Sequence, residues 1–139
     1  MIDLNASMEQ LNSSSKNTLM EQLGIVYLEK KEGFVKAKMP VNDKTKQPMG
    51  ILHGGASLAL AETIGSLGSA LLVDLKQYDV RGANINANHV GAATDGYVYG
   101  EARIIHQGRY THVWNIEIKD ENGRLISVSR LTNMIIERK

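Results

Sequence analysis

The pattern of apolar and polar residues changes twice along the first part of the chain. Within residues 1–23 the composition is compatible with helix from Asn5 onward, and three consecutive serines interrupt it. From Ile25 the pattern alternates with a period of two, passes through a polar turn, and alternates strictly again from Phe34. We therefore expect one or two short helices in an N-terminal helical segment, followed by a hairpin of two strands.

A long apolar segment with almost no charge follows. Between Gln47 and Val73 the chain runs 27 residues with one formally charged side chain, that of Glu62. Turn-forming residues at 42–48 lead into this segment, and its length and composition predict a central helix over residues 53–74. Small residues within this helix allow a sheet to approach its axis closely. They are Ser57, Ala61, Gly65 and Gly68.

The remainder of the chain alternates as strands do and is divided by turn residues. Strands are expected at residues 79–91, 96–106, 110–119 and 124–137. One long helix and about six antiparallel strands have one economical arrangement, in which a curved sheet wraps the helix. The predicted fold is therefore α+β, with one long central helix wrapped by a curved antiparallel sheet of five to six strands, in a single domain of residues 1–139.

Composition removes several classes of function. Sixteen basic and fifteen acidic residues leave a formal charge of +1, and no run of like charges indicates binding to nucleic acid or to a membrane surface. The chain has no cysteine, which excludes disulfides, Cys-ligated zinc, iron–sulfur clusters and a thiol nucleophile. The N-terminus lacks the features of a signal peptide, and the apolar segment 56–73 contains Glu62 and several small residues. We therefore expect a cytoplasmic protein without a membrane span.

Glu62 is the first candidate for chemistry. A carboxylate on a helix that the pattern predicts to be buried all round must be neutralised, paired or used, because desolvating an unpaired ion is costly. It is therefore either a catalytic group or a structural carboxylate, which would reach out to solvent or be paired in a salt bridge. Ser66 follows Glu62 at i+4 on the same helix face, where its hydroxyl either holds the carboxylate or a water, or simply packs against a neighbour.

The segment His53-Gly54-Gly55 stands where the loop becomes the helix. The first amides of a helix are unpaired and lie at the positive end of its dipole, so this is a candidate oxyanion site. The alternative is that the glycines only permit a tight turn. Gly54 and Glu62 are eight residues apart, about 12 Å along a helix axis, so one helix does not present both to one carbonyl. Catalysis would need the amide of one chain and the carboxylate of another, as in a two-fold dimer with antiparallel helices.

Other catalytic motifs are missing from the sequence. No serine stands in a Gly-x-Ser-x-Gly elbow, and no glycine motif typical of phosphate or dinucleotide binding is present. The histidines have no spacing typical of metal ligands, so we expect no metal site. They are His53, His89, His106 and His112.

These segments together resemble the hotdog-fold acyl-CoA thioesterases. The similarity is carried by Lys46-Gln-Pro-Met-Gly-Ile-Leu-His-Gly-Gly-Ala-Ser, Leu60-Ala-Glu-Thr-Ile-Gly-Ser, Ile85-Asn-Ala-Asn-His-Val and His106-Gln-Gly-Arg. It spans about residues 20–137 and is most specific around the helix. The chain is most similar to the branch that contains 1,4-dihydroxy-2-naphthoyl-CoA thioesterases, the enterobactin-pathway proofreading thioesterase and the Arthrobacter-type 4-hydroxybenzoyl-CoA thioesterase.

The resemblance implies a role for each position that matches. Glu62 matches the catalytic carboxylate, either as nucleophile toward the thioester carbonyl or as base for a water, and Gly54 matches the oxyanion donor. Gln47 and His53 match residues that position the thioester, and Ser66 matches the hydroxyl that assists the carboxylate. In such proteins Gln47 and Gly54 come from one subunit, while Glu62 and Ser66 come from its neighbour.

The resemblance also implies a site for coenzyme A at the subunit surface. The candidates for binding the substrate or its CoA part are Arg109, Tyr110, Thr111, Gly55, Arg81 and His89. Cationic and hydroxyl groups near strand ends suit phosphate oxygens, which favours Arg109 over Arg81 and Arg130. A solvated arginine in a turn is the alternative for Arg109. His89 either lines the acyl pocket or is a buried, hydrogen-bonded strand histidine.

The activity implied is hydrolysis of acyl-CoA thioesters to free acid and CoA, with an aromatic acyl group such as 1,4-dihydroxy-2-naphthoyl or a benzoyl type. A homodimer is the minimal active unit and a tetramer of two dimers is expected. Coenzyme A is part of the substrate, so no cofactor is needed; a thioester on a carrier protein is an alternative substrate. Two other functions stay open, a hotdog hydratase or dehydratase and a non-catalytic acyl-CoA-binding protein. No dehydratase-type His-Phe-Pro segment precedes the helix, and a sensor would not need Glu62.

Overall fold

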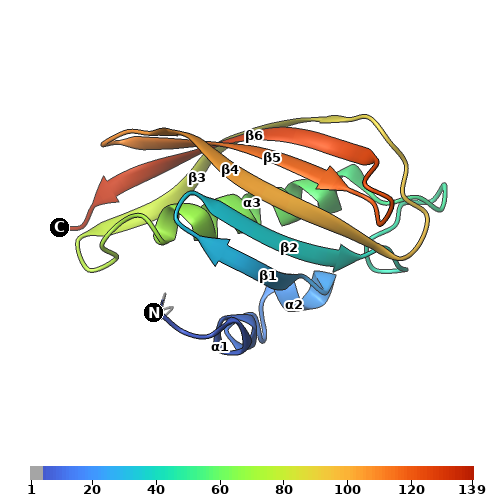
Figure 1. Ribbon diagram of the computed structural model, residues 1–139, viewed down its shortest axis with the longest axis horizontal. Coiled ribbons are helices and arrows are strands. Elements are labelled where there is room, and N and C mark those ends of the chain that lie inside the picture. Colours follow the sequence, from blue (N-terminus) through green and yellow to red (C-terminus); the bar gives the residue numbers. More distant parts are fainter. Residues whose placement is uncertain (1–4) are drawn as a thin grey trace.

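The computed structural model describes residues 5–139 and contains three helices and six strands within them (Figure 1). In chain order these are α1 Met8–Ser13, α2 Leu19–Leu23, β1 Val26–Lys31, β2 Phe34–Pro40, α3 Gly54–Ala70, β3 Tyr78–His89, β4 Tyr97–Gln107, β5 Thr111–Lys119 and β6 Leu125–Glu137. The predicted N-terminal helices, hairpin, central helix and four later strands are confirmed. Residues 1–4 of the predicted helical segment lie outside the described part.

The strands form one antiparallel sheet in the order β1-β2-β4-β5-β6-β3, and α3 lies along its concave face (Figure 1). This confirms the predicted α+β fold with a sheet wrapped around one long helix. The helix is shorter than predicted. It begins after the N-cap His53 and ends at Ala70, with Leu71 as its C-cap. Residues that follow are held in a turn by Asp74, whose carbonyl accepts from the amides of Gln77 and Tyr78 at 2.9 Å each.

One face of α3 is packed tightly against the sheet. A side chain at Gly65 would come within 2.5 Å of Leu131, and one at Gly68 would collide with the ring of Trp114. Ser69, on the same face, accepts hydrogen bonds from the indole of Trp114 at 2.8 Å and from the amide of Asn133 at 2.9 Å. The predicted stripe of small residues therefore does bring the sheet close to the helix.

The hydroxyl of Ser69 also determines the state of a buried histidine. Because it already accepts two hydrogen bonds, it donates its own proton to Nδ1 of His112, 3.0 Å away. Burial, helped by nearby His106, lowers the pKa of His112, so its ring is held neutral. The network fixes the C-terminal half of α3 on the sheet.

The N-terminal segment covers the edge strand β1. The side chain of Asn12 in α1 accepts from the backbone amide of Tyr27 at 2.7 Å and donates to its carbonyl at 3.1 Å. These are backbone groups that an edge strand would otherwise leave unpaired. The helix α1 therefore closes this edge of the sheet.

The other edge strand, β3, pairs along its length with β6 alone. A bulge between Gly82 and Asn84 interrupts the register. The outer edge of β3 has no partner strand within residues 5–139. No helix in that range combines the length and the apolar character needed to cross a membrane.

Candidate active site

The start of α3 is held by a side chain of the preceding loop. His53 is the N-cap, and its Nδ1 accepts a hydrogen bond from the Gly55 amide at 2.7 Å. Because Nδ1 is the acceptor, the ring proton of neutral His53 is on Nε2. The Gly54 amide, in contrast, donates to no acceptor within residues 5–139. Of the two glycines, Gly54 is the one with a free donor for an oxyanion.

His89 packs against the same glycine. Its Nδ1 is 3.0 Å from the hydroxyl of Ser127, and its Nε2 would be 2.7 Å from a side chain built at Gly54. Any residue larger than glycine at position 54 would therefore displace the imidazole. The register of β3 and β6, which places His89 opposite Ser127, creates this contact.

Gln47 completes this part of the site. Its side-chain carbonyl accepts from the Met49 amide, and its backbone carbonyl accepts from the Gly50 amide at 2.9 Å. Gln47, Gly54 and His89 line one cavity of about 440 Å³, together with the buried Ser57. We call this cavity the amide cavity. Three of the predicted site residues are thus brought together, with His53 at the same helix start.

Glu62 and Ser66 line a second cavity of about 540 Å³ on the open face of α3. We call it the carboxylate cavity. Glu62 is exposed to this space and forms no ion pair or hydrogen bond with any residue from 5 to 139, and the Ser66 hydroxyl likewise has no partner there. The carboxylate packs against Gly82 of β3, where a side chain would collide with its oxygen. The expectation that the helix is buried all round is therefore wrong, because one face of α3 carries no sheet.

The absence of a partner also bears on the structural interpretation of Glu62. A salt-bridged carboxylate would have a cation beside it, and residues 5–139 offer Glu62 none. The same residues contain no group of three or more carboxylates and histidines able to hold a metal, and the expectation of a metal-free site stays a prediction. Within the described chain the Glu62 carboxylate is therefore exposed in the carboxylate cavity and is not salt-bridged.

The two cavities lie on different parts of the chain. Glu62 is eight residues beyond Gly54, about 12 Å along the helix axis. They share no lining residue. Within one chain the structure does not bring the amide donor and the carboxylate to a common point.

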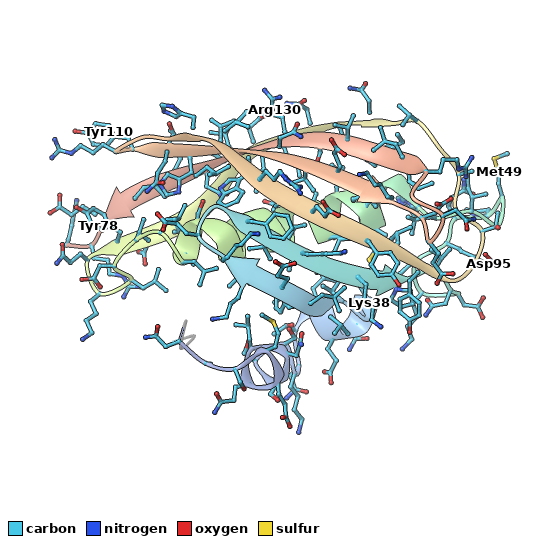
Figure 2. All side chains as sticks on the ribbon, in the orientation of Figure 1. Lys38, Met49, Tyr78, Asp95, Tyr110 and Arg130 are labelled. Atoms are coloured by element: carbon cyan, nitrogen blue, oxygen red, sulfur yellow. The ribbon has the colours of Figure 1, made fainter. Side chains whose placement is uncertain are left out.

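The predicted CoA-binding turn lies far from the amide cavity. Arg109 stacks on the ring of its neighbour Tyr110, with 5.3 Å between the guanidinium carbon and the ring centroid, and both are exposed. Figure 2 places Tyr110 at the end of the molecule opposite Met49, the hydrogen-bond partner of Gln47. Thr111 begins β5 beside this turn. Within one chain, Arg109, Tyr110 and Thr111 thus lie at the other end of the sheet.

The remaining arginine candidates line neither cavity. Arg81 is exposed on β3 and lies 3.8 Å from the carboxylate of Asp79. Arg130 is exposed on the face of the sheet away from α3 (Figure 2). The Gly55 amide is engaged by His53. Binding of CoA by any of these residues stays a prediction.

Three residues in or beside the two cavities were not singled out from the sequence. Ser127 holds His89, Gly82 makes room for Glu62, and Tyr27 lines the carboxylate cavity. Alternation in the sequence predicts which residues share a face of a strand, but it does not give the register that sets their neighbours.

Comparison with known proteins finds thioesterases that are similar to this chain. Residues 49–127 match the family model described as the Thioesterase superfamily. The 1,4-dihydroxy-2-naphthoyl-CoA hydrolase of Escherichia coli is 44% identical over 130 residues, which cover 94% of this chain and 95% of the relative. The proofreading thioesterase EntH of Klebsiella pneumoniae is 44% identical over 126 residues, 91% of each chain. The crystal structure of a mutant thioesterase from Pseudomonas aeruginosa superposes with a TM-score of 0.93, at 42% identity and with 96% of both chains covered.

Proposed function

The chain belongs to the thioesterase superfamily, and from this premise we propose that it hydrolyses acyl-CoA thioesters with an aromatic acyl group, at a site shared by two subunits. The observation that carries the proposal is that the hydrogen-bond donor and the carboxylate needed for hydrolysis lie in two different cavities of one chain. One offers an unpaired amide donor at Gly54, and the other offers an unpaired carboxylate at Glu62. Each cavity lacks what the other contains.

The proposed reaction uses each half for one task. The thioester carbonyl oxygen accepts a hydrogen bond from the Gly54 amide of one subunit, which stabilises the negative charge that develops on it. Gln47 and His53 of the same subunit orient the thioester. Glu62 of the other subunit lies on the open face of the helix, with Ser66 one turn further on to hold the carboxylate or a water. The C–S bond breaks, and CoA leaves as the thiol after taking up a proton.

Two chemical routes fit this placement. In the first, Glu62 removes a proton from water, whose oxygen adds to the carbonyl carbon, and the protonated carboxyl then supplies the proton to the CoA thiolate. In the second, the carboxylate itself adds to the carbonyl carbon and expels the thiolate, and water then hydrolyses the resulting anhydride. Rapid quenching followed by mass spectrometry separates the routes, because only the second places the acyl mass on the peptide that contains Glu62.

The unpaired edge of β3 supports a dimer in which two such strands lie side by side. This edge carries backbone donors and acceptors without partners, and β3 contacts both Glu62, through Gly82, and Gly54, through His89. A second copy placed along β3 would therefore lie beside both cavities. A tetramer of two such dimers, and a carrier-protein thioester in place of CoA, belong to the same proposal.

Mixing two inactive variants tests the shared site. Glu62→Gln and Gln47→Ala are each expected to lower thioester hydrolysis strongly, Glu62→Gln by about a thousandfold or more. Refolded together at equal amounts, they form mixed dimers in which one of the two sites has both intact halves. Activity should return to about a quarter of the wild-type value, since half of the dimers are mixed and each has one working site. Unaltered turnover in Glu62→Gln contradicts the activity, and failure of the mixture to recover contradicts the sharing.

A further inference from the structure

The carboxylate cavity has two walls of different origin. One wall is the open face of α3, with Glu62 and Ser66. The other comes from the N-terminal segment and consists of Leu19 and Met20 of α2 and Tyr27 of β1. Most of the remaining lining is apolar, as suits an aromatic acyl group.

Few polar groups of this cavity are free to meet a substrate. The Thr63 hydroxyl donates to the Ala59 carbonyl at 2.7 Å, and Asp79 and Arg138 form an ion pair at 2.7 Å. Glu62, Ser66 and the hydroxyl of Tyr27 have no hydrogen-bond partner within residues 5–139. The first two belong to the proposed chemistry. The third has no assigned task.

The free hydroxyl of Tyr27 is unusual because the residue is otherwise firmly held. The side chain is 6% exposed, and Asn12 binds both backbone groups of the residue. A tyrosine at a buried position normally has a hydrogen-bond partner for its hydroxyl. The hydroxyl oxygen is not among the fully buried unpaired atoms, and Tyr27 lines the carboxylate cavity. A molecule in that cavity can therefore supply the hydrogen-bond partner. Burial raises the pKa of Tyr27, which keeps the phenol neutral and able to donate.

We propose that Tyr27 is a specificity-determining residue, whose hydroxyl binds a neutral oxygen substituent on the acyl group of the substrate. This rests on the proposed thioesterase function and deepens it, by predicting a preference for hydroxylated over unsubstituted aromatic acyl groups. An anionic substituent is disfavoured, because Glu62 faces the same cavity. A site that hydrogen-bonds a substrate hydroxyl discriminates against the analogue without it, since the polar group of the site is then left unpaired.

Tyr27→Phe removes the hydroxyl and keeps the ring. The substrates are benzoyl-CoA and its 2-, 3- and 4-hydroxy derivatives, assayed at steady state with wild type, Tyr27→Phe and the control Tyr97→Phe, which alters a tyrosine on β4 outside both cavities. For the hydroxy isomer that wild type prefers most over benzoyl-CoA, Tyr27→Phe should lower kcat/KM about tenfold, the loss expected for one hydrogen bond. The loss should appear mainly in KM, because a distal contact is equal in the ground and transition states. Benzoyl-CoA turnover and the melting temperature should stay close to wild type.

The outcomes separate this inference from the function on which it rests. An equal loss on all four esters, or no loss on any, overturns the role of Tyr27 while leaving the thioesterase proposal intact. A wild-type protein that prefers benzoyl-CoA to every hydroxy isomer also overturns it. If wild type hydrolyses none of the four esters, the proposed function for aromatic acyl-CoA fails, and the role of Tyr27 fails with it. Tyr97→Phe should match wild type throughout.

Discussion

The amide cavity and the carboxylate cavity differ in how their polar groups are used. In the first, His53 binds Gly55, His89 binds Ser127 and Gln47 binds its own loop. In the second, the carboxylate of Glu62 and the hydroxyls of Ser66 and Tyr27 have no partners in the described chain. In the proposed function, the groups around the oxyanion donor are fixed before the substrate arrives, which avoids reorganisation during the reaction. The groups proposed to react with the substrate or to select it have no partner until it binds.

Among changes to the amide cavity, the largest effect is expected from altering Gly54 itself. Gly54→Ala should lower kcat about a hundredfold, because the added carbon would lie within 2.7 Å of the His89 ring and force the ring or the amide out of place. Thioester hydrolysis measures the loss, and circular dichroism with a melting curve shows that the fold persists. Activity within twofold of wild type would show that the geometry around Gly54 is not needed for catalysis.

A smaller effect is expected from removing the hydrogen bond that holds His89 in the amide cavity. Ser127→Ala removes the hydroxyl that holds Nδ1 of His89, and kcat/KM should fall about three- to tenfold, as for one neutral hydrogen bond. Ser129→Ala is the matched control, because Ser129 lies two residues further along β6 and its buried hydroxyl has no hydrogen-bond partner within residues 5–139. Equal losses in the two variants would mean that the strand, and not His89, is being perturbed.

The smallest effect concerns the hydrogen-bond network that fixes the C-terminal half of α3 on the sheet. The pKa of His112 is lowered by burial, so the unfolded chain binds the proton more readily than the folded one. The free energy of unfolding should therefore decrease as the pH falls below the ordinary histidine value of about 6.5. Urea denaturation at several pH values should show a shallower decrease in His112→Gln than in wild type. Parallel curves would show that His112 does not contribute to the acid sensitivity.

The sequence predicts the helix and strands that carry the site better than it predicts the side-chain contacts within the site. The length and low charge of the helix segment, together with the alternation in Phe34–Pro40 and Thr111–Lys119, are local properties, and they are sufficient to predict α3 and the sheet. The predicted burial of Glu62 is wrong because a uniformly apolar segment does not reveal which face lacks a sheet. His89 and Ser127 are 38 residues apart and meet through the pairing of β3 with β6. Tyr27 appears in the sequence as one of several alternating strand residues, and its position follows from the Asn12 contact.

The two hydrogen bonds between the Asn12 side chain and the Tyr27 backbone affect how substrate preference can change during evolution. The N-terminal segment that they fasten, with Leu19, Met20 and Tyr27, lies outside residues 49–127, the part that matches the family model. One wall of the carboxylate cavity is therefore encoded separately from the helix that carries Glu62. Mutations in the first 30 residues can reshape the space for an acyl group without altering the reacting groups, so a new preference can evolve by exchange of a short leading segment.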